Sequence, residues 1–188
     1  MQTVTTSRLT LRALHSDDAT AMAMLADDWL VASMLATMPH PFGVGDARDF
    51  LMRRMPEALA RGDFVWAITL RGAETALIGC IGCHHKEEQI YPDLGYWLGR
   101  PFWGRGLASE AARAVCAHCF AAWPVEALES GHFLENVASA RVLEKAGFEA
   151  IGAKTFPCLA RGQPVEGRAM RLTRARWRSL GLAQGVGP

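Results

Sequence analysis

Two glycines spaced one residue apart, Gly104 and Gly106, lie in the string RPFWGRGLASEA, which runs from Arg100 to Ala111. Glycine lets the backbone approach a ligand closely, and the free N–H groups at the start of a helix attract negative charge. A strongly helical run, ASEAARAVCAHCFAAW, begins two residues after the second glycine. We therefore expect this loop to hold a phosphate or pyrophosphate.

Two better-known phosphate motifs do not fit the loop. The dinucleotide fingerprint G-x-G-x-x-G needs a third glycine where this chain has Ser109. It also needs an acidic residue at a strand end about 20 residues further on, and the chain has none there. The P-loop pattern G-x-x-x-x-G-K-[ST] is absent. Both interpretations are excluded.

Five cysteines include two C-x-x-C pairs, Cys80/Cys83 and Cys116/Cys119, which raise the question of a zinc site. The first pair lies in a strand-like run and the second in a helical run, so neither has the tight turn that a zinc knuckle needs. Free cysteine commonly behaves as a small buried apolar residue. We interpret all five as structural thiols and expect no metal. Their odd number, without a secretory signal, indicates a reducing cytoplasm.

The elements that must position the loop follow from periodicity. Residues 8–14 alternate as a strand, and Ser16, Asp17 and Asp18 are expected to cap a helix that runs through 21–35. A second helix over 47–62 is expected to be interrupted by Pro56. Further strands are predicted at 64–70, 76–85, 93–99, 127–133, 149–156 and 168–174, and further helices at 108–123 and 136–147. The order indicates a mixed α/β sheet.

Length and composition limit the function classes. We expect residues 1–188 to form one domain, with a core over 6–175 and a loose tail at 182–188. Half of the residues are apolar, yet no run approaches the roughly 18 that span a membrane. The net charge of +1 gives no electrostatic footprint for nucleic acid. We expect neither nucleic acid nor a membrane as a partner.

Three strings around the loop carry a family resemblance: DLGYWLG at 93–99, ENVASARVLEKAGFEAIG at 135–152 and TSRLTLRAL at 6–14. Together with the glycine loop they resemble the GNAT superfamily of acyl-CoA-dependent N-acetyltransferases. They are most similar to the branch that acetylates the N-terminal amine of ribosomal proteins. The resemblance implies a splayed central mixed sheet flanked by helices. It also implies acetyl-CoA as co-substrate and direct acetyl transfer in a ternary complex.

The resemblance assigns the acetyl-CoA contacts. In GNAT enzymes the pantetheine arm pairs with backbone in a split between the fourth and fifth strands. The pyrophosphate sits on a loop of the pattern R/Q-x-x-G-x-G/A, whose first place is Trp103 here, a departure usual in the resembled branch. For Arg105 and Lys145 a solvated side chain is the alternative interpretation, and for Asn136 a helix cap. The residues so implied are Trp97, Leu98, Gly99, Trp103, Gly104, Arg105, Gly106, Leu107, Ala108, Ser109, Asn136 and Lys145.

Proton transfer is assigned less completely. Asp93 matches the position of a glutamate in the resembled branch and would act as general base, through a water because its side chain is shorter. His84 and His85 are rival bases, of which strand alternation turns one to solvent. The tyrosine that many GNAT enzymes use as an acid is replaced by Leu143. Ser139 would lie near the thioester sulfur, with helix capping as the alternative.

The amine acceptor would bind, by the same resemblance, between the first two helices and the loop near the last two strands. The residues there are apolar, with little acidic charge, so we expect a protein or peptide N-terminus. A small-molecule amine and a non-catalytic acyl-CoA-binding module remain alternatives, and a homodimer is left open. The expected lining residues are Trp29, Met34, Met38, Pro39, His40, Pro41, Phe42, Phe156 and Pro157, with the ARGQPVEG turn.

Overall fold

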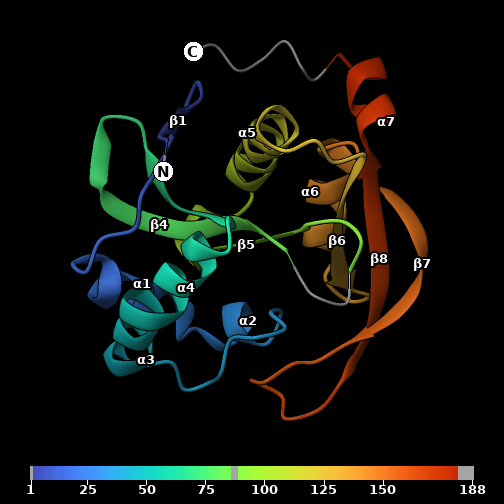
Figure 1. The fold of residues 1–188 in the computed structure, drawn as a ribbon. Coiled ribbons are helices and arrows are strands. Elements are labelled where there is room, and N and C mark those ends of the chain that lie inside the picture. Colours follow the sequence, from blue (N-terminus) through green and yellow to red (C-terminus); the bar gives the residue numbers. More distant parts are fainter. Residues whose placement is uncertain (1, 86–88, 182–188) are drawn as a thin grey trace.

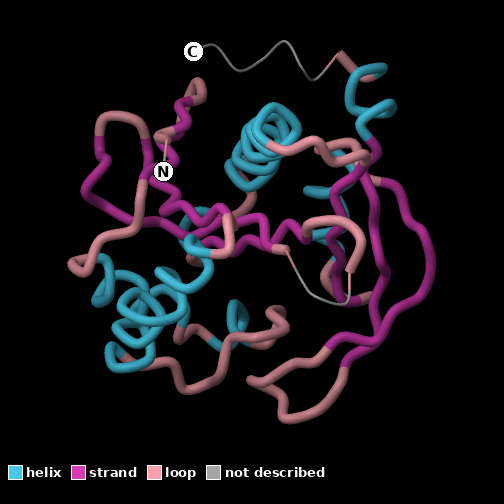
Figure 2. Tube along the Cα trace, viewed as in Figure 1, coloured by secondary structure: helices cyan, strands magenta, loops and turns pink. Residues whose placement is uncertain are grey.

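An eight-stranded mixed sheet with helices on both faces organises the computed structural model, which describes residues 2–85 and 89–181 (Figure 1, Figure 2). The strand order is β1-β2-β3-β4-β5-β6-β8-β7. The strands are β1 Val4–Thr5, β2 Leu9–Arg12, β3 Phe64–Leu70, β4 Ala73–His84, β5 Asp93–Leu98, β6 Ala127–Phe133, β7 Glu149–Phe156 and β8 Val165–Thr173. The mixed α/β class is confirmed, and the tail predicted at 182–188 lies outside the described residues.

The helices divide between the two faces of the sheet. Figure 1 shows α5 and α6 on one side of the central strands and the group α1, α3 and α4 on the other. The helices are α1 Asp18–Ala26, α2 Trp29–Ala32, α3 Val44–Asp49, α4 Met55–Ala60, α5 Leu107–Ala122, α6 Val137–Lys145 and α7 Arg174–Ser179, with a π-helical segment η1 Phe50–Arg54 and a 3-10 turn η2 Arg100–Phe102.

The sheet splits between β5 and β6. These two strands run parallel and share one paired position, Asp93 opposite Glu129. The N–H of Glu129 donates to the carbonyl of Pro92 at 2.8 Å, and Oγ of Ser130 donates to the carbonyl of Leu94 at 2.8 Å. Beyond these contacts β5 continues along β4 while β6 continues along β8. The splayed sheet implied by the resemblance is confirmed.

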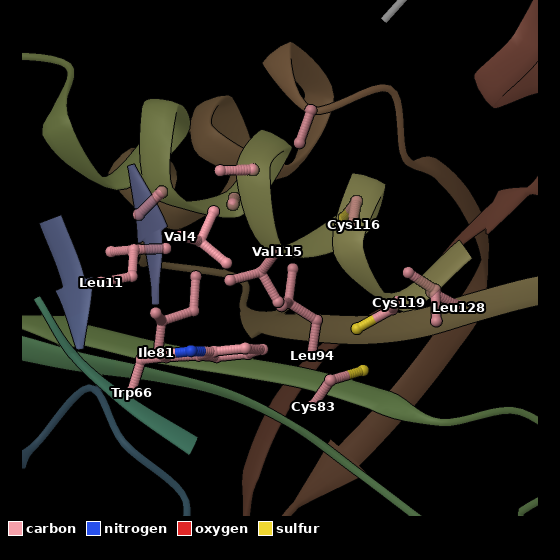
Figure 3. Close-up of a cluster of buried hydrophobic side chains, with 14 of the residues drawn as sticks. Val4, Leu11, Trp66, Ile81, Cys83, Leu94, Val115, Cys116, Cys119 and Leu128 are labelled. Atoms are coloured by element: carbon pink, nitrogen blue, oxygen red, sulfur yellow. The ribbon is translucent and has the colours of Figure 1, made fainter. Parts of the chain in front are cut away.

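Each face of the sheet has its own core. Strand alternation turns Ile81 and Cys83 toward α5, whereas Cys80 packs in the second core with α1 and α3. Figure 3 shows Cys83 near Cys116 and Cys119 in the first core. All five cysteines are free and buried, and burial raises the pKa of the Cys116 and Cys119 thiols. The two C-x-x-C pairs are thus buried in the core, as predicted.

The prediction of one helix through residues 21–35 is wrong. The chain forms α1 and then the short α2, with Asp27 and Asp28 between them. Asp28 accepts a 2.9 Å hydrogen bond from the N–H of Leu30, and this cap starts a new helix. The cap predicted for the first helix is also different. The side chain of Asp18 instead binds the guanidinium of Arg12 at 2.7 and 2.8 Å and the N–H of His15 at 2.8 Å.

The second predicted helix is not interrupted at Pro56. It continues from α3 through η1 into α4, and the proline lies in the first turn of α4. The π-helical geometry directly before it changes the hydrogen-bond spacing where proline lacks an N–H, so the helix changes type and does not end.

The described residues also include no helix that is long and apolar enough to cross a membrane.

Candidate acetyl-CoA and amine site

The glycine loop lies between the 3-10 turn η2 and the start of α5. Gly104 and Gly106 have left-handed φ angles of 71° and 73°, which side chains rarely adopt. No heavy atom lies within 4 Å of a Cβ built on Gly104, so the space above this glycine is open. The N–H groups of the first helical turn have no partner within α5. The exposed loop therefore presents backbone donors and the positive end of a 16-residue helix.

Trp103 joins the loop to the end of β5. Its indole Nε1 donates a 2.7 Å hydrogen bond to the carbonyl of Leu98, while 44% of the residue surface stays exposed. This bond occupies the Leu98 carbonyl and fixes the turn that leads into the glycines. Where the common family pattern carries Arg or Gln, this chain has Trp103, whose indole joins the loop to β5 by a hydrogen bond.

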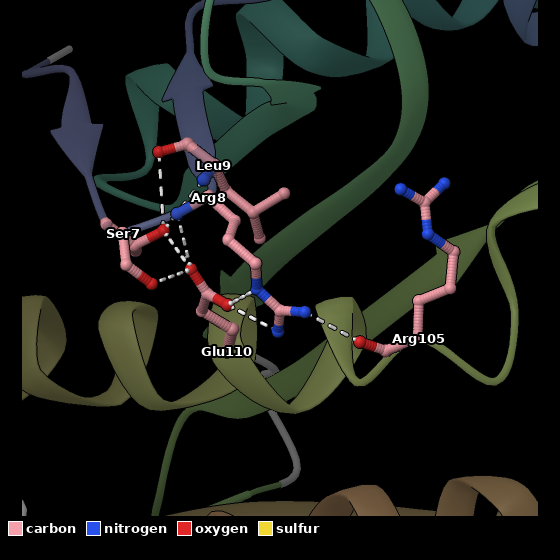
Figure 4. A network of polar contacts seen from close by, with 6 residues as sticks. Ser7, Arg8, Leu9, Arg105 and Glu110 are labelled. Carbon is pink, nitrogen blue, oxygen red and sulfur yellow. Dashed lines mark hydrogen bonds and ion pairs between the residues drawn. The ribbon is translucent and has the colours of Figure 1, made fainter.

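A polar network holds the other side of the loop to the N-terminal strands (Figure 4). The Glu110 carboxylate, on the first turn of α5, accepts hydrogen bonds from Oγ1 of Thr6 at 2.6 Å and from N and Nε of Arg8 at 2.9 and 2.6 Å. Nη1 of Arg8 then donates to the carbonyl of Arg105 at 2.8 Å. Burial alone would raise the pKa of Glu110, but the donors around it lower that pKa below its usual value. The side chain of Arg105 points away from the network, as Figure 4 shows.

The edge of β5 that faces the split is set by alternation. The N–H of Gly99 donates to the carbonyl of Ile78 on the β4 side, whereas the carbonyls of Leu94 and Leu98 accept bonds from the opposite side. Alternate residues of an antiparallel strand direct their backbone groups to opposite neighbours. Tyr96 and Leu98 therefore present backbone groups to the split, whereas Trp97 and Gly99 present theirs to β4. Of the three residues expected to pair with pantetheine, only Leu98 lies at that edge.

A tyrosine that sequence reasoning missed crosses the split. The hydroxyl of Tyr96 lies 2.8 Å from Oγ of Ser139, on α6, and 3.3 Å from the Ser139 carbonyl. Asn136 is the N-cap of α6, and its Oδ1 accepts from the N–H of Ser139 at 3.0 Å. The capping interpretation is thus confirmed for Asn136. The hydroxyl of Ser139 instead pairs with the phenol. Alternation within DLGYWLG was the available signal, because it places Tyr96 on the same face as Leu94 and Leu98.

Of the candidate bases, Asp93 and His84 lie on the opposite face of β5, whereas the ring of His85 contacts Trp123 at the end of α5 at 4.5 Å. Asp93 is paired in register with His84 on β4 and with Glu129 on β6. His84 and His85 place Nδ1 at 3.6 and 3.3 Å from the buried carboxylate of Asp63. As alternation predicts, one of the two histidines is exposed, His85, while His84 is partly buried. Because β4 ends at His84, both nevertheless reach the same aspartate.

Three further residues assigned to the cofactor differ in exposure. Leu107 and Ser109 are 2% and 5% exposed, so their side chains face the core and only their backbone N–H groups are available to a phosphate. Ala108 packs partly against the first core. Lys145 is exposed at the C-terminal end of α6, at the opposite end of that helix from Asn136.

The two segments expected to line the acceptor pocket, the turn after α2 and the loop between β7 and β8, contact each other. Nε of Arg161, in the loop between β7 and β8, donates to the carbonyl of Ser33 at 2.8 Å, and the N–H of Leu159 donates to the carbonyl of Ala36 at 3.2 Å. Arg161 also pairs with Glu135, just before α6. The turn after α2 and the β7–β8 loop thus form one continuous wall next to the split.

The aromatic residues of this wall differ in their availability to a ligand. The rings of Trp29 and His40 form an edge contact at 5.3 Å, and Trp29 is 49% exposed. Phe42 is 6% exposed and belongs to the second core, against which Met38 also packs. Phe156 packs against Phe133 at a ring distance of 6.2 Å. Trp29 is therefore the most exposed aromatic residue of the predicted set.

Comparison with known proteins places this geometry in a family. The model of the acetyltransferase (GNAT) domain matches residues 8–149. A relative from Bacillus licheniformis, the uncharacterized N-acetyltransferase p20, is 27% identical over 152 residues, which cover 81% of this chain and 85% of the relative. The relative's name gives the same class of enzyme.

Two solved structures share the fold. RimL, a ribosomal L7/L12 alpha-N-protein acetyltransferase in complex with coenzyme A, has a TM-score of 0.77 at 17% identity, covering 92% of this chain and 98% of its own. The microcin C7 self-immunity acetyltransferase MccE, in complex with acetyl-CoA and AMP, has a TM-score of 0.75 at 15% identity, with coverages of 89% and 93%. With three quarters of the chain inside the domain match, the protein belongs to the GNAT family of N-acetyltransferases.

Proposed function

We propose that this enzyme transfers an acetyl group from acetyl-CoA to the N-terminal amine of a protein or peptide. The observation that carries the proposal is the split between β5 and β6, which opens toward the glycine loop at the start of α5. A strand edge with unpaired amide groups can bind an amide-containing chain as an added strand. The adjoining helix start can bind its phosphates. The two features together suit the pantetheine arm and the pyrophosphate of one ligand.

The residues fit acetyl-CoA by their backbone chemistry. The left-handed positions Gly104 and Gly106 shape a cradle, and a side chain at Gly104 would fill the open space above it. Arg105 adds positive charge beside it, and Trp103 fixes its distance from β5. When bound, acetyl-CoA supplies the thioester carbonyl that the amine attacks. The N–H of Tyr96, directed into the split by strand alternation, is the donor we assign to the oxyanion that develops there.

Proton removal falls to Asp93 on the acceptor face. An α-amino group has a pKa of about 7.7, so much of it carries a proton at neutral pH and must lose it before attack. Asp93 would accept that proton through a water, at the point where β5 and β6 meet. His84, in register beside it and backed by Asp63, is the alternative base. Ser139 would donate a hydrogen bond to the departing sulfur from the other face.

The charges around the acceptor wall favour an acceptor with a single amine. Asp28 pairs with Arg100 at 3.4 Å, Glu135 pairs with Arg161, and Glu129 pairs with Arg171 at 2.6 Å. A polyamine or aminoglycoside would need several carboxylates to receive its ammonium groups. These three carboxylates are already neutralised by arginine. The similarity to RimL, whose name describes an alpha-N-protein acetyltransferase, supports the same choice.

A small-molecule amine is the second candidate acceptor. The similarity to MccE, a self-immunity acetyltransferase solved with acetyl-CoA and AMP, favours it. The half-exposed ring of Trp29 beside His40 would then stack on a planar group of the substrate. In either case we place the enzyme in the cytoplasm, since its five cysteines are free thiols.

Thiol release from acetyl-CoA, measured against a panel of amines, tests the proposal. The panel contains peptides that begin with Ala, Ser or Met, free amino acids, aminoacyl nucleotides, polyamines and aminoglycosides. We expect turnover with the peptides alone. Turnover only with a small molecule would establish the second candidate. Binding of acetyl-CoA without turnover of any amine would contradict both and favour a non-catalytic acyl-CoA-binding module.

A further inference from the structure

The pairing of Tyr96 with Ser139 joins the two arms of the split. Tyr96 belongs to β5, which stays with β4, and Ser139 belongs to α6, which follows β6. Their hydroxyl oxygens lie 2.8 Å apart. The phenol sits on the same face of β5 as Leu94 and Leu98, which pack with residues of α5 in the first core. This is the face on which the helix that follows the glycine loop lies, and Asp93 occupies the other.

Hydrogen-bond direction in this pair follows from acidity. A phenol, with an ordinary pKa near 10, is a stronger donor than an aliphatic hydroxyl. The 2.8 Å contact is also shorter than the 3.3 Å contact from the phenol to the Ser139 carbonyl. The phenol therefore donates to Oγ of Ser139. A hydroxyl that accepts one hydrogen bond still has its own proton to donate, and that of Ser139 is then available to a third atom.

Burial keeps the phenol in its donor form. Desolvation raises the pKa of Tyr96, an effect that the hydrogen bond with Ser139 only partly offsets. Tyr96 therefore stays protonated over the pH range in which an α-amino group reacts. It is a permanent donor to Ser139 and a poor source of protons. The helix-tyrosine acid of many GNAT enzymes, replaced here by Leu143, is consequently not restored by Tyr96 as an acid.

We propose that Tyr96 is a positioning residue for the departing thiolate: its hydroxyl donates to Ser139, which turns the serine proton toward the sulfur of acetyl-CoA. The proposal rests on the proposed function, because it needs a thioester in the split. When the C–S bond of the tetrahedral intermediate breaks, its electron pair stays on sulfur. The hydrogen bond from Ser139 stabilises that thiolate, and no proton leaves either hydroxyl. The carbonyl re-forms as the C–S bond breaks. Nitrogen loses two protons through the base to solvent, one from the ammonium before attack and one after the C–N bond has formed.

Substitution Tyr96→Phe removes the donor and keeps the ring. We expect kcat with acetyl-CoA and an Ala-initiated peptide to fall about tenfold, the loss associated with one hydrogen bond. The Kd of acetyl-CoA should change less than twofold. Ser139→Ala should give a similar loss, and the double variant should lose no more than either single variant. Tyr91→Phe is the matched control, since it removes the chain's other phenol oxygen, from a ring that packs under Arg171.

A spectroscopic readout separates positioning from a merely structural role. The ultraviolet absorbance of the thiolate reports the pKa of the thiol of CoA bound to the enzyme. We expect that pKa to be lower than for free CoA in the wild type and in Tyr91→Phe, and to return toward the free value in Tyr96→Phe and Ser139→Ala. If Tyr96→Phe does not fold, Ser139→Ala and Ser139→Cys carry the same measurement.

The outcomes are distinguishable from failure of the proposed function. A wild-type enzyme that neither binds nor turns over acetyl-CoA contradicts the proposed function and, with it, the role of Tyr96. A wild type that is active, with unchanged kcat and an unchanged thiol pKa in Tyr96→Phe, overturns the positioning role alone. Additive losses in the double variant would also overturn it, because the two hydroxyls would then act independently.

Discussion

Nη1 of Arg8 donates a 2.8 Å hydrogen bond to the carbonyl oxygen of Arg105, although the two residues are 97 positions apart in the sequence. The same guanidinium is paired with Glu110 at 2.6 Å. One side chain from the turn between β1 and β2 thus holds both the loop that precedes α5 and the first turn of that helix. The geometry of the anion-binding backbone depends on a residue outside the glycine motif.

Arg8→Ala should therefore weaken acetyl-CoA binding without touching the glycines. A hydrogen bond from a charged group contributes about 1.5–3 kcal/mol when buried. Because Arg8 is half exposed, we expect a smaller effect, about tenfold in Kd. Isothermal titration calorimetry measures the Kd of acetyl-CoA for the variant and the wild type. Arg53→Ala is the control, because Arg53 is 73% exposed in a surface pair with Asp49. An unchanged Kd in Arg8→Ala would mean that the loop holds its shape alone.

Gly106→Val should abolish detectable acetyl-CoA binding while the protein remains folded. The left-handed φ of 73° costs a β-branched residue roughly 1–2 kcal/mol, and its Cβ would lie 3.6 Å from Nη2 of Arg8, the side chain that holds the loop to α5. Gly72→Val is the matched control. Gly72 has a left-handed φ of 84° in the turn between β3 and β4, so it imposes the same strain away from the site. Thermal melts with and without acetyl-CoA compare the two, and equal ligand-induced shifts would refute the loop assignment.

Asp93→Asn should slow turnover far more than it weakens cofactor binding. Loss of a general base lowers kcat by about a hundredfold or more. The Kd of acetyl-CoA should stay within about twofold, because Asp93 lies on the face of β5 opposite Tyr96. The measurement is a pH profile of kcat for wild type, Asp93→Asn and His84→Gln. If only His84→Gln loses activity, the base is the histidine that Asp63 supports. If Asp93→Asn is as active as wild type at neutral and high pH, Asp93 is not the base.

Much of the architecture was predictable because periodicity and local motifs fix it. The largely apolar runs at 64–70 and 93–99 predicted β3 and β5, and Gly72, with its left-handed φ, lies in the turn that joins β3 to β4. The predictions of the first helix and of its cap were wrong because an aspartate near a helix start can either cap the helix or bind a side chain elsewhere. Asp28 starts α2 by capping it, whereas Asp18 leaves the helix terminus to bind Arg12.

The site was less predictable because its contacts join distant segments. Tyr96 and Ser139 are 43 positions apart, and only the divergence of β5 from β6 brings a strand residue to a helix that lies beyond the next strand. The Asp63 contacts of His84 and His85 likewise depend on the place where β4 ends. Sequence motifs identified the loop and its helix. The residues that brace the loop, Arg8 and Glu110, carry no local signal of that role.

Glu110 should make the stability of the fold acid-sensitive. Its pKa is lower in the folded protein than in the unfolded chain, so its stabilising contribution is present above the ordinary glutamate pKa of about 4.3 and is lost as the pH falls through the lowered value. Glu110→Gln removes the charge that Arg8 and Thr6 bind. We expect it to reduce the free energy of unfolding by about 1–3 kcal/mol at pH 7.

Urea unfolding of wild type and Glu110→Gln from pH 7 to pH 3 gives the measurement. The difference between the two should shrink below about pH 4, where the wild-type carboxyl also becomes protonated. Glu57→Gln is the control, since Glu57 is exposed on α4 and its substitution should change stability by less than about 0.5 kcal/mol. A difference that stays constant down to pH 3 would mean that the shape of Glu110, and not its charge, holds the N-terminal strands to α5.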